Sequence, residues 1–332
     1  MKKVPRVSLA KIKRFLKIHP IVIIRRCTQF LFLVLLNLLL FYDILKPLNN
    51  DFINNTLLPF FDNVLNFLKT YLPELPIEQS AASPFTTIPS AFDVMQLRAT
   101  LPEFPFLEIG IMLIIAALVG RGFCGWVCPF GLLQDVLEKI PTPKYRVSHT
   151  TNRELAQIKY IFLAFTLILI SWIGIAKYTN TFKGIEEALG YFARVPWAAI
   201  SPADTLESFI PWLIKKEVFA QLETPYEIFK WPIFFWIRIA FLIFVIAISL
   251  FIPRAYCRYI CPVGALMGLF GKYSMITFKI NPIRCTNCRE CEIHCPMGIR
   301  FPESGAIRSR ECIMCGVCMA RCPEKAIGIG VF

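Results

Sequence analysis

Eight of the thirteen cysteines in this chain lie in two identically spaced runs near its C-terminal end. Both runs have the pattern C-x2-C-x2-C-x3-C-P, with Cys285, Cys288, Cys291 and Cys295 in the first and Cys312, Cys315, Cys318 and Cys322 in the second. This is the spacing of bacterial [4Fe–4S] sites, in which the fourth cysteine of each run ligates the other cluster. The pattern therefore predicts one cluster on Cys285, Cys288, Cys291 and Cys322, and a second on Cys312, Cys315, Cys318 and Cys295.

Zinc and disulfides are the alternative uses of so many cysteines. Structural zinc sites take four thiolates, usually from two separated C-x2-C pairs, which is not the arrangement here. Disulfides require an oxidising compartment, whereas thiolates that hold iron belong in a reducing one. His294 lies inside the first run, and we interpret it as a solvated neighbour. The two runs thus predict a segment through which electrons pass.

The composition is that of an integral membrane protein. Hydrophobic residues make up 56% of the 332 residues and charged residues 18%, and the mean hydropathy is +0.56. Lys and Arg, which give a formal net charge of +13, exceed the acids in 1–26, 121–159 and 254–325, and the acids prevail in 46–103 and 177–230. This alternation follows the positive-inside rule, so it predicts a membrane topology and argues against a nucleic-acid partner.

Four apolar segments separate the charged regions, and each has roughly the 20 residues that a crossing requires. The predicted transmembrane helices cover about residues 27–45, 104–124, 159–176 and 232–252. An even number of crossings places both termini on the cytoplasmic side. The predicted fold is an all-α polytopic membrane protein with a small α+β ferredoxin domain, divided into a basic N-terminus (1–26), a four-span membrane domain (27–276) and a ferredoxin domain (277–332).

Two further cysteine pairs form a repeat inside the membrane domain. The segment Arg121-Gly-Phe-Cys124-Gly-Trp-Val-Cys128-Pro-Phe-Gly131 matches Arg254-Ala-Tyr-Cys257-Arg-Tyr-Ile-Cys261-Pro-Val-Gly264 at a constant offset of 133 positions. Both follow an out-to-in span, which predicts a duplicated two-span unit with a pseudo-two-fold axis along the membrane normal.

If C-x3-C lies on a helix, both of its thiols share one face. The pseudo-symmetry can then bring Cys124, Cys128, Cys257 and Cys261 together at the inner membrane boundary. We expect a third iron–sulfur or metal centre there. Redox-active thiol pairs and plain packing cysteines are the alternatives.

Glu108 and Arg238 lie within predicted spans at similar depth, toward the outer leaflet. Ionisable groups in such positions are costly and are usually paired or functional. The functional hypothesis is a quinol pocket in which Glu108 accepts a proton and Arg238 steadies it; the alternative is that both side chains extend to the outer interface. His19, His149 and His294 all lie outside the spans, so the chain has no pair of histidines to hold a haem within the membrane.

Four spans, two C-x3-C-P motifs at the inner face and a double-cluster ferredoxin together resemble the NapH/MauN family of membrane ferredoxin-type proteins. The resemblance covers nearly the whole chain from the first span onward. It implies oxidation of menaquinol or ubiquinol and transfer of electrons to a partner protein. It also implies that the eight ferredoxin cysteines are ligands and that the four C-x3-C-P cysteines are functional. Regulators of nitrous oxide reduction and copper-reducing oxidase assembly factors share these parts.

The predicted function is therefore electron transfer between the quinone pool and a redox partner, as a quinol-linked oxidoreductase subunit of a prokaryotic plasma membrane. The partner subunits expected are of the iron–sulfur, cytochrome or molybdenum-enzyme type. The alternative is an assembly or regulatory factor that reduces a metal such as copper, or thiols, in a partner oxidoreductase. A third hypothesis is a purely structural anchor.

Overall fold

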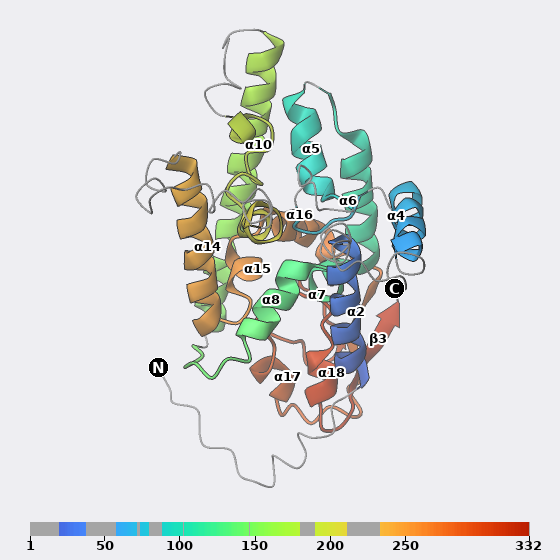
Figure 1. The fold of residues 1–332 in the computed structure, drawn as a ribbon. Helices are drawn as coiled ribbons and strands as arrows, with labels where there is room; N and C mark the ends of the chain where they lie inside the picture. Colours follow the sequence, from blue (N-terminus) through green and yellow to red (C-terminus); the bar gives the residue numbers. More distant parts are fainter. Residues whose placement is uncertain are drawn as a thin grey trace.

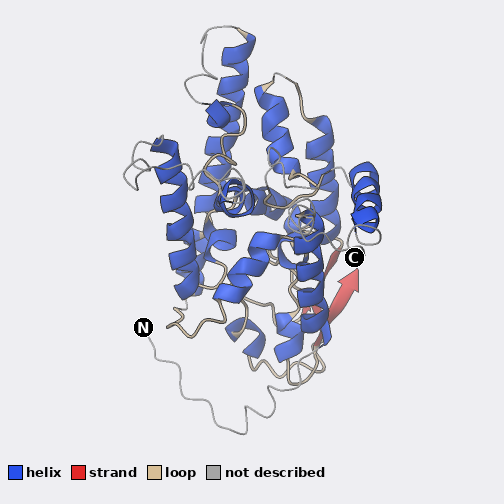
Figure 2. Cartoon of the chain, viewed as in Figure 1, coloured by secondary structure: helices blue, strands red, loops and turns tan. Residues whose placement is uncertain are grey.

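The computed structural model describes residues 20–37, 58–71, 74–79, 88–101, 103–145, 147–179, 190–210 and 233–331. Most of these residues are helical, and a small sheet lies at one edge of the molecule (Figures 1 and 2). The first helices are α2 (Pro20–Leu36), α4 (Leu58–Tyr71) and α5 (Ala91–Thr100). Of the predicted N-terminal region, residues 1–19 lie outside the described residues.

A succession of three helices occurs twice and carries the two C-x3-C-P motifs. The first copy is α6 (Phe106–Val119), α7 (Gly122–Trp126) and α8 (Pro129–Leu137), and the second is α14 (Ile233–Phe251), α15 (Ala255–Tyr259) and α16 (Pro262–Gly271). The short helices α7 and α15 begin 133 residues apart, as do α8 and α16. The repeat seen in the sequence is thus a repeat in the fold.

The C-x3-C motif does not lie on one helix, which corrects the sequence-based expectation. Cys124 lies within α7, whereas Cys128 has extended dihedral angles and is the N-cap of α8. Cys257 and Cys261 are divided in the same way between α15 and α16. The proline after each second cysteine is the reason, because proline disfavours the helical region for the residue before it and favours the first position of a helix.

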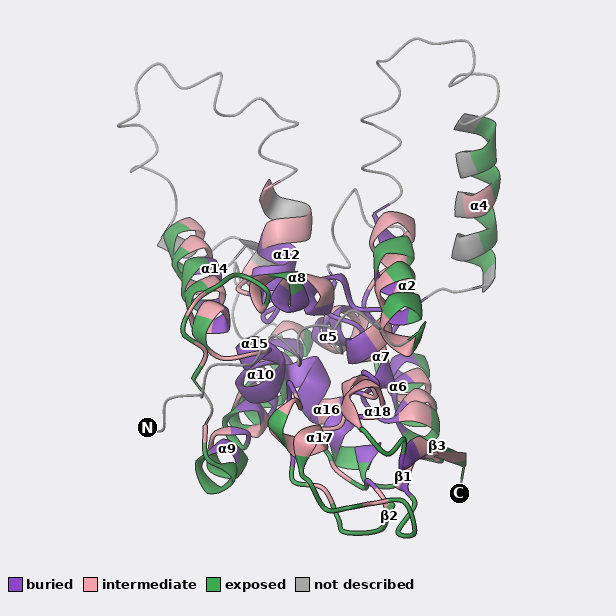
Figure 3. Cartoon of the chain, turned by 90° about the horizontal axis from the view of Figure 1, so that it is seen from below, coloured by how far each residue is buried: buried purple, intermediate pink, exposed green. Residues whose placement is uncertain are grey.

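Two buried arginines join the repeats by a reciprocal exchange. Arg121 of the first repeat donates to the carbonyl of Cys257 at 2.6 Å, and Arg254 of the second donates to the carbonyl of Cys124 at 3.0 Å. Both arginines are fully buried. Each guanidinium therefore fixes the backbone of the opposite motif. The surrounding helices α7, α15 and α16 carry many buried residues (Figure 3).

Between the repeats, α9 (His149–Leu155) leads into α10 (Ile158–Tyr178). Three short helical elements follow, which are η3 (Gly190–Ala193), α12 (Pro202–Asp204) and η4 (Thr205–Phe209). Within the described part of the chain, the helical stretch His149–Tyr178 alone is long and apolar enough to cross a membrane. Helix α6, with 14 residues, extends only about 21 Å, because Gly120, at a φ of 56°, ends it. Helix α14 coincides with the predicted span 232–252, whereas α2 begins before the predicted span 27–45 and covers only its first part, residues 38–45 lying outside the described residues.

The predicted outside connection 46–103 reaches deep into the helical core. Leu75 forms an isolated bridge with Ser90, and both are buried together with Ile77. Helix α5 then packs against α6 and α10, with Phe92 completely inaccessible to solvent. This connection therefore contributes side chains to the interior between the repeats.

The ferredoxin part contains an antiparallel sheet of order β2-β1-β3, formed by β1 (Ile276–Ile280), β2 (Gly305–Ala306) and β3 (Ile327–Val331). Strand β1 pairs with both neighbours, and Ile280 is opposite Ile327 in the register. Two short helices, α17 (Glu290–Ile293) and α18 (Val317–Arg321), belong to the two cysteine runs. The sheet lies at one edge, and the runs face the repeated motifs (Figure 1).

We expect the substitution Gly264→Ala to destabilise the fold by about 1–3 kcal/mol, since an inserted methyl group must displace buried neighbours. A Cβ at this position would lie 2.5 Å from the Arg121 guanidinium. The measurement is the thermal unfolding midpoint in detergent. Gly110→Ala is the matched control, because a Cβ there has no neighbour within 4 Å. An equal effect of both substitutions would contradict the role given to the arginine exchange.

Candidate iron–sulfur sites

The second cysteine run and the last cysteine of the first run enclose one small cavity. Its lining includes four cysteines, which are Cys295, Cys312, Cys315 and Cys318. Phe278, Ile299 and Ile313 shield the cavity from water. Four thiols around an apolar space provide the donors that a [4Fe–4S] cluster requires, so the residues fit this group.

The first run lines a larger cavity of about 210 Å³ through Cys285 and Cys291. Cys322 packs with these two residues around the same apolar core, which Phe278 and Ile327 help to form. The four cysteines assigned to the first cluster are thus more accessible than those of the second, with Cys288 exposed.

Both runs have the same strained backbone around their second cysteine. The residues before it, Asn287 and Met314, have φ values of 53° and 51°, and those after it, Arg289 and Gly316, have 56° and 72°. Such left-handed conformations cost free energy for residues other than glycine. Their occurrence at equivalent places indicates that the C-x2-C-x2-C segments are wound into the same tight loop.

Burial disfavours thiolates at these positions as long as nothing binds to them. It raises the pKa of Cys295 to about 11 and that of Cys312 to about 12, and nearby Cys315 adds to both shifts. A bound metal requires the thiolate form, so cluster assembly must release these protons.

The four cysteines of the repeated motifs are all buried near the centre of the molecule. Gln134 donates to Cys257 Sγ at 3.0 Å, and the backbone amide of Gly264 donates to Cys261 Sγ at 3.2 Å. Cys261 itself donates to Glu78 Oε2 at 3.0 Å. Within the described ranges, no three His, Cys, Asp or Glu side chains lie close enough to hold a single metal ion. A mononuclear site is therefore not preformed at these cysteines.

The first repeated motif contacts the second cysteine run directly. Cys124 belongs to the same buried apolar cluster as Ile313 and Cys315. Trp126 donates from its indole nitrogen to the carbonyl of Met314 at 2.8 Å, and the Gly125 backbone is so close to Ile313 that no side chain would fit. The two groups of cysteines are thus joined by a continuous packed contact.

A carboxylate of the ferredoxin part completes this contact. Glu311, next to Cys312, forms an ion pair with Arg121 at 2.6 Å and a second one with Lys159. Both basic side chains are fully buried. Leaving such charges without a partner is costly, so Glu311 holds the second run against the helical part.

The structure does not pair Glu108 with Arg238. Glu108 forms an ion pair with Arg98 at 2.7 Å, and Arg238 forms one with Asp204. Similar depth along two helices does not place their side chains on the same side of a bundle, and α6 and α14 pack against different neighbours. The expectation that Arg238 steadies Glu108 is wrong in this respect.

Three acidic residues at these sites were not singled out from the sequence. Glu78 accepts hydrogen bonds from Trp197, Ser201 and Tyr256 besides that from Cys261. Asp135 accepts two from Arg254, and although burial opposes its ionisation, Arg254 holds its pKa well below the usual range. Glu311 is the third. An acid within an apolar stretch was the available signal for Asp135, and the sequence around Glu78 and Glu311 carries no such signal.

Comparisons with known proteins agree with these sites. The family described as "4Fe-4S binding domain" matches residues 104–148 and 234–281, and that described as "4Fe-4S dicluster domain" matches residues 277–323. The first family covers both repeats with their C-x3-C-P motifs, and the second covers both cysteine runs. No solved structure matches the chain.

Similar proteins occur in archaea and bacteria. An uncharacterized protein of Methanocaldococcus jannaschii is 25% identical over 66% of this chain and 76% of its own length. The putative electron transport protein YccM of Escherichia coli is 27% identical over 64% of this chain and 51% of its own. The ferredoxin-type protein NapH of Haemophilus influenzae is 25% identical over 65% of this chain and 64% of its own.

The helical repeats, the ferredoxin fold and the iron–sulfur domains together define an iron–sulfur electron-transfer protein. Within this class, the chain is similar to the ferredoxin-type proteins NapH and MauN.

We expect Cys295→Ser to remove the cluster formed with Cys312, Cys315 and Cys318, although Cys295 belongs to the other run. The iron content of the purified protein should fall by about four atoms per chain, the content of one [4Fe–4S] cluster. Iron analysis and electron paramagnetic resonance are the measurements. Cys27→Ser is the control, since Cys27 is exposed on α2. Retention of both resonance signals in Cys295→Ser would contradict the crossed ligand assignment.

Proposed function

We propose that the chain is a membrane subunit that links the quinone pool to a redox partner. It would cross a prokaryotic plasma membrane four times, near α2, α6, α10 and α14, with both termini on the cytoplasmic side. The observation that carries the proposal is the packed contact between Cys124 of the first repeat and the second cysteine run. This contact joins the interior of the helical bundle to the ferredoxin part without an intervening water layer.

The surface of the helices supports insertion in lipid. Large apolar side chains are exposed on each of them, for example Phe30 on α2, Ile114 on α6, Ile168 on α10 and Ile243 on α14, each 61–69% accessible. Large apolar side chains exposed in this number are typical of a surface that contacts a membrane or another protein. A lipid environment would cover all four helices at once.

Eight cysteines would hold the two clusters, as assigned from the spacing. When bound, a [4Fe–4S] cluster accepts and donates single electrons at a potential set by its surroundings. Ile299 and Ile313 keep water from the second cluster site, and Glu311 holds the second cysteine run against the helical part. The four cysteines of the repeated motifs are proposed to hold a third iron–sulfur centre, with redox-active thiols as the alternative.

A pair of buried carboxyl groups supports Glu108 as the residue that accepts a proton from quinol. Glu74 lies beside Glu108, and both are buried next to Arg98. Burial, reinforced by the charge of Glu108, raises the pKa of Glu74 to about 7. Two carboxyl groups can hydrogen-bond each other only when one carries a proton. A site that gains and loses a proton near neutral pH is suited to general base catalysis.

Arg238 is proposed to act at a distance from this pair. It donates to Thr205 Oγ1 at 3.1 Å and forms an ion pair with Asp204. These contacts orient the turn α12–η4, whose Ser201 donates to Glu78 at 2.9 Å. Arg238 would thus position the residues beside Cys261 rather than contact quinol.

The alternative function, reduction of copper or of thiols in another protein, has one feature in its favour, which is the presence of four free thiols. Burial raises the pKa of Cys128 and Cys261 well above the usual value. Buried, protonated thiols are poor nucleophiles. A partner protein also has no access to them, so the quinol-linked function is supported better.

We expect Glu108→Gln to lower the rate of menaquinol oxidation by about 10²-fold, the usual effect of losing a general base. The measurement is the oxidation of a reduced quinone analogue by protein in lipid nanodiscs, followed by cluster absorbance. Glu103→Gln is the control, since Glu103 is exposed in the same region. An unchanged rate with both variants would exclude Glu108 from the reaction, and turnover of copper alone would favour the alternative function.

A second expectation concerns pH. Because the pKa of Glu74 is raised from 4.5 to about 7, the folded protein holds this proton more tightly than the unfolded chain. Its contribution to stability is present below pH 4.5 and is lost as pH rises to about 7. Glu74→Gln should therefore be more stable than the native protein at pH 8 by about 1–2 kcal/mol. Thermal unfolding at pH 5 and pH 8 measures the difference, and identical pH dependence in both proteins would refute it.

A further inference from the structure

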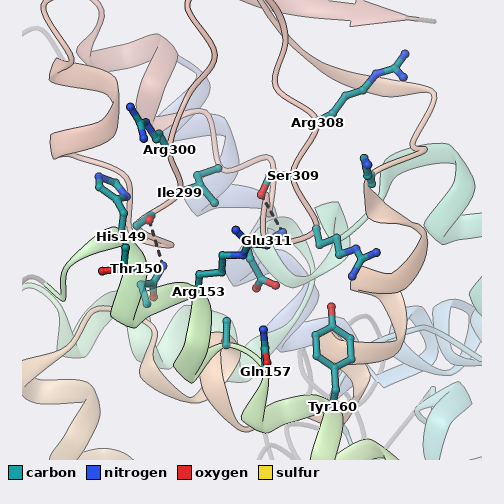
Figure 4. A pocket seen from close by; sticks show the side chains of 15 residues that line it. His149, Thr150, Arg153, Gln157, Tyr160, Ile299, Arg300, Arg308, Ser309 and Glu311 are labelled. Atoms are coloured by element: carbon teal, nitrogen blue, oxygen red, sulfur yellow. Dashed lines mark hydrogen bonds between the residues drawn. The ribbon is translucent and has the colours of Figure 1, made fainter.

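A cavity of about 650 Å³ lies between the cytoplasmic end of the α9–α10 stretch and two loops of the ferredoxin part. Figure 4 shows Arg153, Gln157 and Tyr160 on one side and Arg300, Ser309 and Glu311 on the other. The volume is within the range of small-molecule sites, which is roughly 300–1,000 Å³.

The lining is strongly basic. It contains five Lys or Arg side chains, which are Arg153, Lys272, Arg300, Arg308 and Arg310. Glu311 is the one acidic residue in the lining, and its carboxylate is already held by Arg121 and Lys159. The cavity therefore carries an excess of positive charge that an anion would neutralise, and its walls come from both the helical and the ferredoxin parts.

An apolar surface begins where the cavity ends. Ile161 directly follows the lining residue Tyr160 on α10, Phe165 lies about one turn beyond Ile161, and the two are 68% and 59% exposed. Tyr273, next to Lys272, is 70% exposed. A ligand with an anionic head and an apolar tail could contact both the basic cavity and the apolar surface beside it, whereas a soluble anion would contact only the basic cavity.

We propose that this cavity binds the phosphate headgroup of an anionic phospholipid, with the acyl chains lying along α10. Basic pockets at the cytoplasmic ends of membrane helices take such headgroups. The phosphate bridges Arg153 and Lys272 of the helical part to Arg300 and Arg310 of the ferredoxin part. The bound lipid thereby stabilises the contact that Glu311 makes with Arg121. The choice of lipid as the source of the phosphate rests on the proposed membrane insertion.

The test is a titration of the full-length, cluster-loaded protein in detergent with fluorescent phosphatidylglycerol and, separately, phosphatidylcholine. The native protein should bind phosphatidylglycerol more tightly. The double variant Arg153→Gln/Arg310→Gln should bind it about thirtyfold more weakly, given the usual contribution of each basic residue. Arg284→Gln/Lys325→Gln is the charge-matched control, because both residues are exposed elsewhere on the ferredoxin part, and it should retain the native affinity.

Each other result contradicts the proposal. Equal weakening in the two double variants would mean that only the overall charge matters. Equal affinity for the two lipids would mean that no anionic headgroup is recognised. Competition by glycerol phosphate as strong as that by phosphatidylglycerol would assign the cavity to a soluble phosphate ligand. Circular dichroism of each variant shows whether it is folded, and because binding is the readout, these outcomes are independent of quinol oxidation.

Discussion

The exchange of two arginines between the repeats is the interaction on which the rest of the structure depends. Each guanidinium reaches across to the opposite repeat and donates to the carbonyl of the first cysteine in its motif. Gly264 leaves the space that the Arg121 guanidinium occupies, and a side chain at Gly131 would meet the Cys124 carbonyl to which Arg254 donates. Because the arginines are buried and their charges must be compensated, the repeats cannot separate without exposing two cations.

The compensation differs between the two arginines, and the difference decides which other part of the chain each ion pair holds. Arg254 is neutralised by Asp135, which also pairs with Arg25 and Arg26 and so holds the beginning of α2. Arg121 is neutralised by Glu311 of the ferredoxin part. Asp135 on α8 thus joins α2 to the first repeat and to Arg254 of the second, whereas Arg121 joins the ferredoxin part to the first repeat.

The sequence was most informative about the cysteine motifs, because ligation of a cluster requires a fixed spacing of cysteines along the chain. The two cysteine runs, the repeated C-x3-C-P motif and the crossing of Cys295 to the second run could all be derived, since ligand geometry tolerates few spacings. The break between Cys124 and Cys128 follows from the proline after Cys128, although the motif reads as a helical face. The partners of Glu108 and Arg238 could not be derived, because rotation of helices about the bundle axis leaves no periodic signal. Glu78 and Glu311 act through tertiary contacts with distant segments, so their neighbours in the chain give no indication of their roles.

Gly268 occupies the place in α16 that Asp135 has in α8, at the same offset of 133 positions. Arg310 and Tyr160 fill the space in front of its missing side chain. A carboxylate in one repeat and a hydrogen atom in the other make the two repeats non-interchangeable, so the two sides of the bundle differ although the succession of helices is repeated. The ferredoxin part is attached to one side of the bundle only, so it cannot move to the other side. Any protein that exchanges electrons with the ferredoxin part must therefore approach from that side.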